Sequence, residues 1–125
     1  LTPCGVVKGV QTFALPIIGF PGIFRGALDV RAKTITDPMC TAAALALAGM
    51  AEQTGLSPEY ILPNMDEWEV FPREAAAVAM KAIEEGVAGK TITYEEELKN
   101  AQEIIQRSRN LTQTMMAEGF IAEAT

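Results

Sequence analysis

The sequence contains no histidine. This absence excludes Ser-His-Asp and Cys-His nucleophile systems within the chain, and it removes the commonest zinc ligand. The phosphate-binding motifs GxGxxG and GxxxxGK[ST] are missing, and so is any CxxC pair. The two cysteines, Cys4 and Cys40, are too few for a disulfide scaffold and favour a reduced, cytoplasmic setting.

Positive charge and long apolar runs are also scarce. Ten Lys and Arg residues against 16 Asp and Glu residues give a net charge of −6, which argues against a nucleic-acid-binding face. The most apolar stretch, residues 13–24, is too short to span a bilayer and is interrupted by Pro16, Pro21 and Gly22. It also lacks the layout of a secretory signal. We therefore expect neither a nucleic-acid nor a membrane partner.

Helix start and stop signals divide most of the chain after residue 20 into helical segments. Pro21-Gly22 precedes a short helical run at 23–30, in which Arg25 and Asp29 are four residues apart. That spacing allows an ion pair on one face of a helix. We interpret the pair as structural rather than catalytic.

A longer helix is predicted at 38–53. Asp37 is placed to cap its first turn, Pro38 to occupy its first helical position, and Gly55 to stop it. Apolar residues recur on one face: Met39, Ala43, Leu47 and Met50. Because the segment is rich in alanine, it can approach neighbouring elements closely, and we expect it to be buried.

Two further helices are predicted at 72–85 and 94–118. Gly86 and Gly119 end them, and Thr93 and Glu96 form a capping box at the start of the second. This last helix carries an apolar stripe, which packs either against its own domain or against another subunit. No segment predicts a strand, so the chain by itself is expected to be mainly α.

Three carboxylates lie close together before the third predicted helix, those of Asp66, Glu67 and Glu69. They could suggest a metal site. A flexible loop provides no fixed ligand geometry, however, and we interpret the cluster as solvated surface.

The segment GFPGIFRGALDVRA at residues 19–32 resembles the late signature of bacterial malic enzymes. The resemblance continues through four shorter motifs and covers about residues 17–125. These motifs are ITDPM at 35–39, YILP at 60–63, DEWEVFP at 66–72 and MMAEGFI at 115–121.

The resemblance implies that the chain is the C-terminal helical part of an α/β Rossmann-type NAD(P)-binding domain. The parent enzyme would oxidatively decarboxylate malate to pyruvate and carbon dioxide, with NAD or NADP as hydride acceptor and Mg²⁺ or Mn²⁺ as Lewis acid. A homo-oligomeric parent is implied as well. The family's Tyr–Lys pair and its three metal-binding carboxylates lie upstream, so no catalytic residue and no metal ligand is expected in this chain.

By the same resemblance, Gly19, Phe20, Pro21 and Gly22 lie near the cofactor and substrate, and they are the candidate cofactor-binding residues. The alternative is that they form only a turn and a helix start. The family also has an Asn-Asn pair just before this segment. Leu15 and Pro16 stand there instead, and neither can donate the amide hydrogen bond of such a contact.

Residues 1–17 resemble the translation of a sequencing adapter, and we expect no stable element in them. The hypothesis divides the chain into a non-native or disordered leader at 1–17 and a malic enzyme fragment at 18–125. Such a fragment should be inactive alone and should bind no cofactor tightly. Two alternatives remain: a small helical interaction module that self-associates through 94–118, and a domain of a split enzyme.

Overall fold

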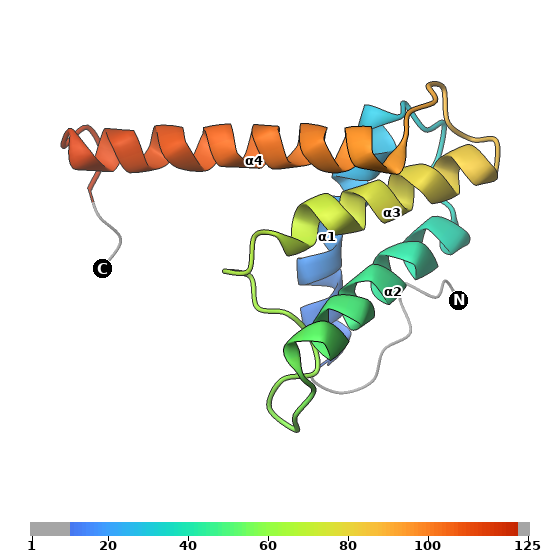
Figure 1. The fold of residues 1–125 in the computed structure, drawn as a ribbon, viewed down its shortest axis with the longest axis horizontal. Helices are drawn as coiled ribbons and strands as arrows, with labels where there is room; N and C mark the ends of the chain where they lie inside the picture. The colour runs from blue at the N-terminus through green and yellow to red at the C-terminus, as the bar shows by residue number, and fades with distance from the viewer. Residues whose placement is uncertain (1–10, 123–125) are drawn as a thin grey trace.

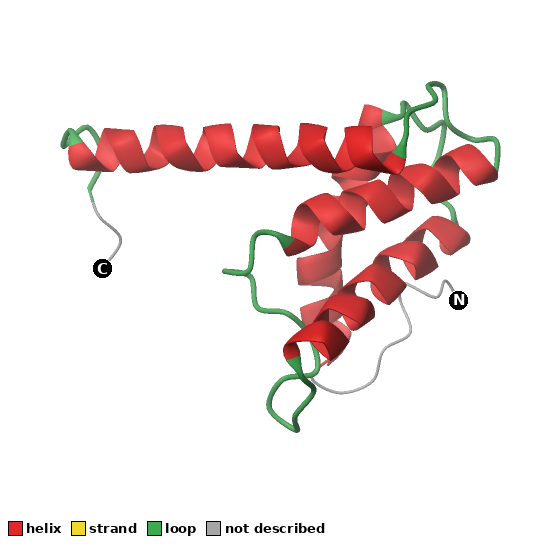
Figure 2. Cartoon of the chain, viewed as in Figure 1, coloured by secondary structure: helices red, strands yellow, loops and turns green. Residues whose placement is uncertain are grey.

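A computed structural model describes residues 11–122, and from residue 17 onward it also describes the side chains. Four helices make up this part of the chain: α1 (Gln11–Asp29), α2 (Asp37–Thr54), α3 (Val70–Glu84) and α4 (Tyr94–Ala117). Figure 2 shows helices joined by loops without a strand in the described part, where Ser57 and Tyr60 form one isolated bridge. The expectation of a mainly α chain is confirmed.

Helix α3 lies at the centre and packs against each of the other three helices. Ala75, Ala76, Val78, Ala79 and Ala82 on it are fully buried, because alanine and valine allow neighbouring helices to approach closely. The larger core cluster joins α1, α2 and α3. Its buried members are Ala27, Val30, Met39, Ala43, Val78, Ala79 and Ala82.

Helix α1 is longer than the sequence predicts. It begins at Gln11 and continues through the positions of Pro16 and Pro21, so the expectation that no stable element forms before residue 18 is wrong for residues 11–17. Directly after this segment, Ile18 is buried in a second core cluster with Leu47 and Val70, whereas Ile17 is 58% exposed.

The other helix boundaries lie close to their predicted positions, with one correction at the start of α2. Its N-cap is Thr36 rather than Asp37. Thr36 has an extended backbone, and its hydroxyl accepts a hydrogen bond from the Met39 amide at 3.3 Å. The capping box of Thr93 and Glu96 at the start of α4 is confirmed.

Glycines end three of the helices, as the sequence predicts. Gly55, Gly86 and Gly119 follow α2, α3 and α4 respectively, and all three have positive φ angles. None of the helices within residues 11–122 combines the length and the apolar character that a bilayer span requires.

Helix α4 packs on the other helices only near its start. Glu97 and Ala101 are its buried residues, and Figure 1 shows the rest of the helix extending away from α1, α2 and α3. Beyond Ala101 the helix is less covered. Leu111 is exposed, whereas Ile104, Ile105, Met115 and Met116 are half-buried, and the Arg109 guanidinium lies 6.0 Å from the centroid of the Trp68 ring.

Candidate functional site

The four candidate residues Gly19, Phe20, Pro21 and Gly22 lie inside α1 and point to two different sides. Gly19 and Gly22 are buried, whereas Phe20 and Pro21 are exposed. They form neither a turn nor a helix start, so that alternative is wrong. The structure thus separates the two glycines from the two side chains that are accessible from outside.

The glycines allow α1 to approach α3 closely. A Cβ atom at Gly19 would lie 3.4 Å from Oε1 of Glu74, and one at Gly22 would overlap the same carboxyl group. One turn further on, a Cβ atom at Gly26 would overlap the carbonyl oxygen of Ala75. A larger residue at Gly26 would push the two helices apart, and one at Gly22 would displace the Glu74 side chain.

Glu74 is the buried polar group beneath this glycine face. Its side chain is fully buried, and neither carboxyl oxygen has a hydrogen-bond partner. Burial raises the pKa of Glu74 to about 9, so the group holds its proton at neutral pH. Sequence reasoning missed it, although Val70, Glu74 and Val78 recur every four residues and thereby place Glu74 on the buried face of α3.

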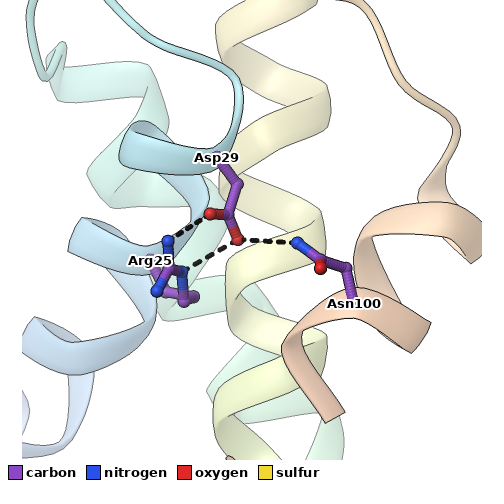
Figure 3. A network of polar contacts seen from close by, with 3 residues as sticks. All are labelled: Arg25, Asp29 and Asn100. Atoms are coloured by element: carbon purple, nitrogen blue, oxygen red, sulfur yellow. Dashed lines mark hydrogen bonds and ion pairs between the residues drawn. The ribbon is translucent and has the colours of Figure 1, made fainter. Parts of the chain in front are cut away.

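A second polar group joins the end of α1 to the start of α4. Arg25 and Asp29 form the predicted ion pair, with the Arg25 Nε donating to Asp29 Oδ2 at 2.8 Å. The same Asp29 oxygen accepts a hydrogen bond from Asn100 Nδ2 at 3.3 Å. Figure 3 shows Arg25 and Asn100 reaching Asp29 from different helices, so Asp29 links α1 to α4.

Glu97 lies next to this group and is fully buried, again without a partner for either carboxyl oxygen. Burial, reinforced by the neighbouring Asp29 carboxylate and opposed by Arg25, raises the pKa of Glu97 to about 8. A cavity of about 370 Å³ adjoins it. The residues that line this cavity are Asp29, Lys90, Thr91, Ile92, Glu96, Glu97 and Asn100.

No group of three or more potential metal ligands comes together among residues 11–122. In the acidic loop, Glu67 instead accepts hydrogen bonds from the Tyr60 hydroxyl at 2.8 Å and from the Asn64 amide at 2.9 Å. Asp66 and Glu69 are exposed. Cys40 is half-buried on α2 and is not a free cysteine.

Comparison with known proteins relates these helices to one family. The family described as "Malic enzyme, NAD binding domain" matches residues 15–85. The bifunctional malic/malolactic enzyme of Bacillus subtilis (strain 168) is 41% identical over 96 residues, which are 77% of this chain and 22% of that protein. The NADP-dependent malic enzyme of Rhizobium meliloti (strain 1021) is 42% identical over 90 residues, which are 61% of this chain and 12% of that protein.

Among solved structures, the malic enzyme of Entamoeba histolytica matches with a TM-score of 0.84 and 44% identity. The match covers 86% of this chain and 22% of that one, so the chain spans about a fifth of the length of this relative. These matches give no support to the alternative of a small helical interaction module. The chain belongs to the malic enzyme family, and it matches that family within the NAD-binding domain.

Proposed function

We propose that this chain is a helical part of an enzyme that oxidatively decarboxylates malate to pyruvate and carbon dioxide. The observation that carries the proposal is the family match over residues 15–85, which includes all of α2 and α3 and α1 from residue 15 onward. The hydride acceptor is NAD or NADP, since the family description names NAD and the Rhizobium meliloti relative is NADP-dependent.

Within that enzyme, α1 would position the segment from Gly19 to Gly22 near the cofactor. Phe20 is 59% exposed, and with Pro21 it offers an apolar surface on the outside of the helix. Gly19 and Gly22 contribute indirectly, because they let α1 lie directly on Glu74 of α3. We therefore assign any direct contact with the dinucleotide to Phe20 and Pro21, and a positioning role to the two glycines.

We assign no catalytic residue and no metal ligand to this chain. In the parent enzyme, Mg²⁺ or Mn²⁺ would act as a Lewis acid on the substrate oxygen. The residues that hold it are proposed to lie outside this chain, because no suitable group of ligands forms among residues 11–122. The isolated chain should therefore be inactive and should bind no cofactor tightly.

Three further features belong to the same proposal. Residues 1–17 are a leader that is not native to the enzyme, and residues 18–125 are the enzyme fragment. The parent enzyme is a homo-oligomer that acts on malate in the cytoplasm. It requires neither a nucleic acid nor a membrane.

A chimeric enzyme tests the function. Residues 18–125 would replace the corresponding part of the Entamoeba histolytica malic enzyme, which is 44% identical in sequence. We expect the chimera to reduce NAD or NADP in the presence of malate and Mn²⁺, and the isolated chain not to do so. A folded chimera without activity would refute the proposed function, and turnover by the isolated chain would refute its inactivity.

A further inference from the structure

Glu97 is a buried acid at the contact between α1 and α4, and the proposed function does not use it. The residue is fully buried, and neither of its carboxyl oxygens has a hydrogen-bond partner among the side chains described from residue 17 to residue 122. The donors around it are already engaged, since Arg25 and Asn100 both donate to Asp29 (Figure 3). A buried polar group without a partner is costly, and it can mark the position of a bound ion or ligand.

The cavity of about 370 Å³ beside Glu97 provides room for such a ligand. Its volume is within the range of small-molecule pockets, which is roughly 300–1,000 Å³. Ile92, which packs against the larger core cluster, forms an apolar part of the wall, and Thr91 and Asn100 add neutral polar groups. A molecule with a polar head and a short apolar part therefore fits this cavity better than a single ion does.

The charge around the cavity favours a cation. Three of the residues that line it are acids, Asp29, Glu96 and Glu97, and one is a base, Lys90. Arg25 is paired with Asp29, and Lys90 is exposed to solvent, so neither of the two bases donates to Glu97. The first turn of α4 contains three glutamates, which oppose the attraction of a helix N-terminus for anions.

The shape of the site favours a primary ammonium group as the cation. Within the described part of the chain no three potential metal ligands come together, so a bare divalent ion lacks the oxygen ligands that it needs. Glu97 meets the cavity from inside the protein, so the head group has to be compact. A primary ammonium is compact and has three N–H donors, whereas a guanidinium is a wide planar fork.

We propose that this cavity is a binding site for a small aliphatic amine, whose primary ammonium group donates hydrogen bonds to Glu97 and whose alkyl part lies against Ile92. The Asp29 carboxylate beside Glu97 adds a second negative charge near the ammonium group. The site is independent of the proposed function, because it needs neither the dinucleotide nor the rest of the enzyme.

Amine binding should depend on pH through Glu97. Burial and the neighbouring Asp29 raise the pKa of Glu97 to about 8, and Arg25 opposes them, while Lys81 and Glu84 on α3 pair with each other. At neutral pH Glu97 therefore holds its proton, and it must release that proton to the solvent when the ammonium group binds. The ionised fraction of a group with a pKa of about 8 rises from about 3% at pH 6.5 to about 50% at pH 8, so the affinity should rise roughly 15-fold.

Titration of the full chain with butylamine tests the site. Amide NMR shifts of residues 90–100 would be followed at about pH 6.5 and at about pH 8, where butylamine stays charged because a primary amine titrates near pH 10.4. We expect saturable shifts with a Kd below about 10 mM at the higher pH and a Kd roughly 15-fold weaker at the lower pH. Tetramethylammonium has the same charge without an N–H donor, so it should bind at least about tenfold more weakly.

Two variants assign the binding to Glu97. Glu97→Gln keeps nearly the shape of the protonated acid but cannot ionise, so butylamine binding should fall at least about tenfold at pH 8 and lose its pH dependence. Glu52→Gln, at an exposed position on α2, should bind like the wild-type chain. If Glu97→Gln does not fold, the pH dependence of the wild-type chain decides.

Several outcomes would overturn the proposal. These are shifts that stay linear with butylamine concentration at about pH 8, equal affinities at the two pH values, or full binding by a folded Glu97→Gln variant. Tetramethylammonium binding as tight as that of butylamine would do the same, because the cavity would then attract any cation. None of these readouts involves malate or a dinucleotide, so failure of the amine site would leave the proposed function untouched.

Discussion

Replacing Glu74 by glutamine should make the stability of the chain less dependent on pH. The Glu74 carboxyl is buried without a hydrogen-bond partner, and burial raises its pKa from 4.5 to about 9. In the unfolded chain the same group is surrounded by water and titrates near its ordinary value of 4.5. Between these two pKa values, the folded state therefore binds one proton more than the unfolded state.

This difference in bound protons determines whether the free energy of unfolding rises or falls with pH. The contribution of Glu74 to stability is fully present below the unfolded pKa of 4.5, and it is lost as the pH rises towards the folded pKa of about 9. One proton corresponds to about 1.4 kcal/mol per pH unit, so Glu74 should lower the free energy of unfolding by roughly 2.7 kcal/mol between about pH 5.5 and about pH 7.5. Glu97, with a pKa raised to about 8, should contribute a slope of the same sign.

Glutamine has nearly the shape of a protonated glutamate and does not ionise. The Glu74→Gln variant should therefore match the wild-type chain near pH 5 and become more stable than it at neutral pH. Urea unfolding, followed by circular dichroism at a series of pH values, measures the slope. Glu52→Gln, at an exposed position on α2, is the control. If Glu74→Gln kept the wild-type slope, the carboxyl of Glu74 would not be buried as a neutral acid, and the reasoning would fail.

Four other substitutions test separate parts of the structure. Gly26→Ala should destabilise the chain by roughly 1–3 kcal/mol, because its Cβ atom would overlap the Ala75 carbonyl. Gly49→Ala lies in open space on α2 and should stabilise the chain by roughly 0.5–1 kcal/mol. The urea midpoint should fall in the first variant and rise in the second. Thr93→Ala should cost about 1 kcal/mol and speed amide exchange in the first turn of α4, and unchanged exchange would contradict the capping role. Asp29→Asn should lower the pKa of Glu97 from about 8, while burial keeps that pKa above 4.5. NMR titration of Glu97 measures the change. An unchanged pKa of Glu97 would mean that the Asp29 carboxylate does not raise it.

The sequence predicts the helices with strong local signals and misses what depends on packing. Helices α2, α3 and α4 are bounded by caps, prolines and glycines, and those signals act within a few residues of the chain. The sequence does not predict the start of α1, because Pro16 and Pro21 indicate a break where the helix in fact continues. The close approach of Gly22 and Gly26 to α3 also depends on a distant segment, so no local signal predicts it.

In the candidate site too, the sequence predicts local contacts and misses those that depend on packing. The spacing of Arg25 and Asp29 predicts their ion pair correctly, because both residues lie on one helix. For Glu74 the only sequence signal is its four-residue spacing from Val70 and Val78. The burial of Glu97 depends on which neighbour covers it, because a single glutamate on a helix usually faces water. The stripe on α4 likewise shows that a surface is apolar without showing what covers it.

Helix α4 is held at two places along its length. Glu97 and Ala101 are buried beside Asp29 and Asn100, and eight residues after Ala101 the guanidinium of Arg109 lies 6.0 Å from the centroid of the Trp68 ring. The helix continues from Arg109 to Ala117, and at 1.5 Å per residue this last part is roughly 12 Å long. A rotation of about 10° about the Trp68 contact would therefore displace the tip of α4 by roughly 2 Å, so the contact between Arg109 and Trp68 limits how far the exposed end of the helix can move.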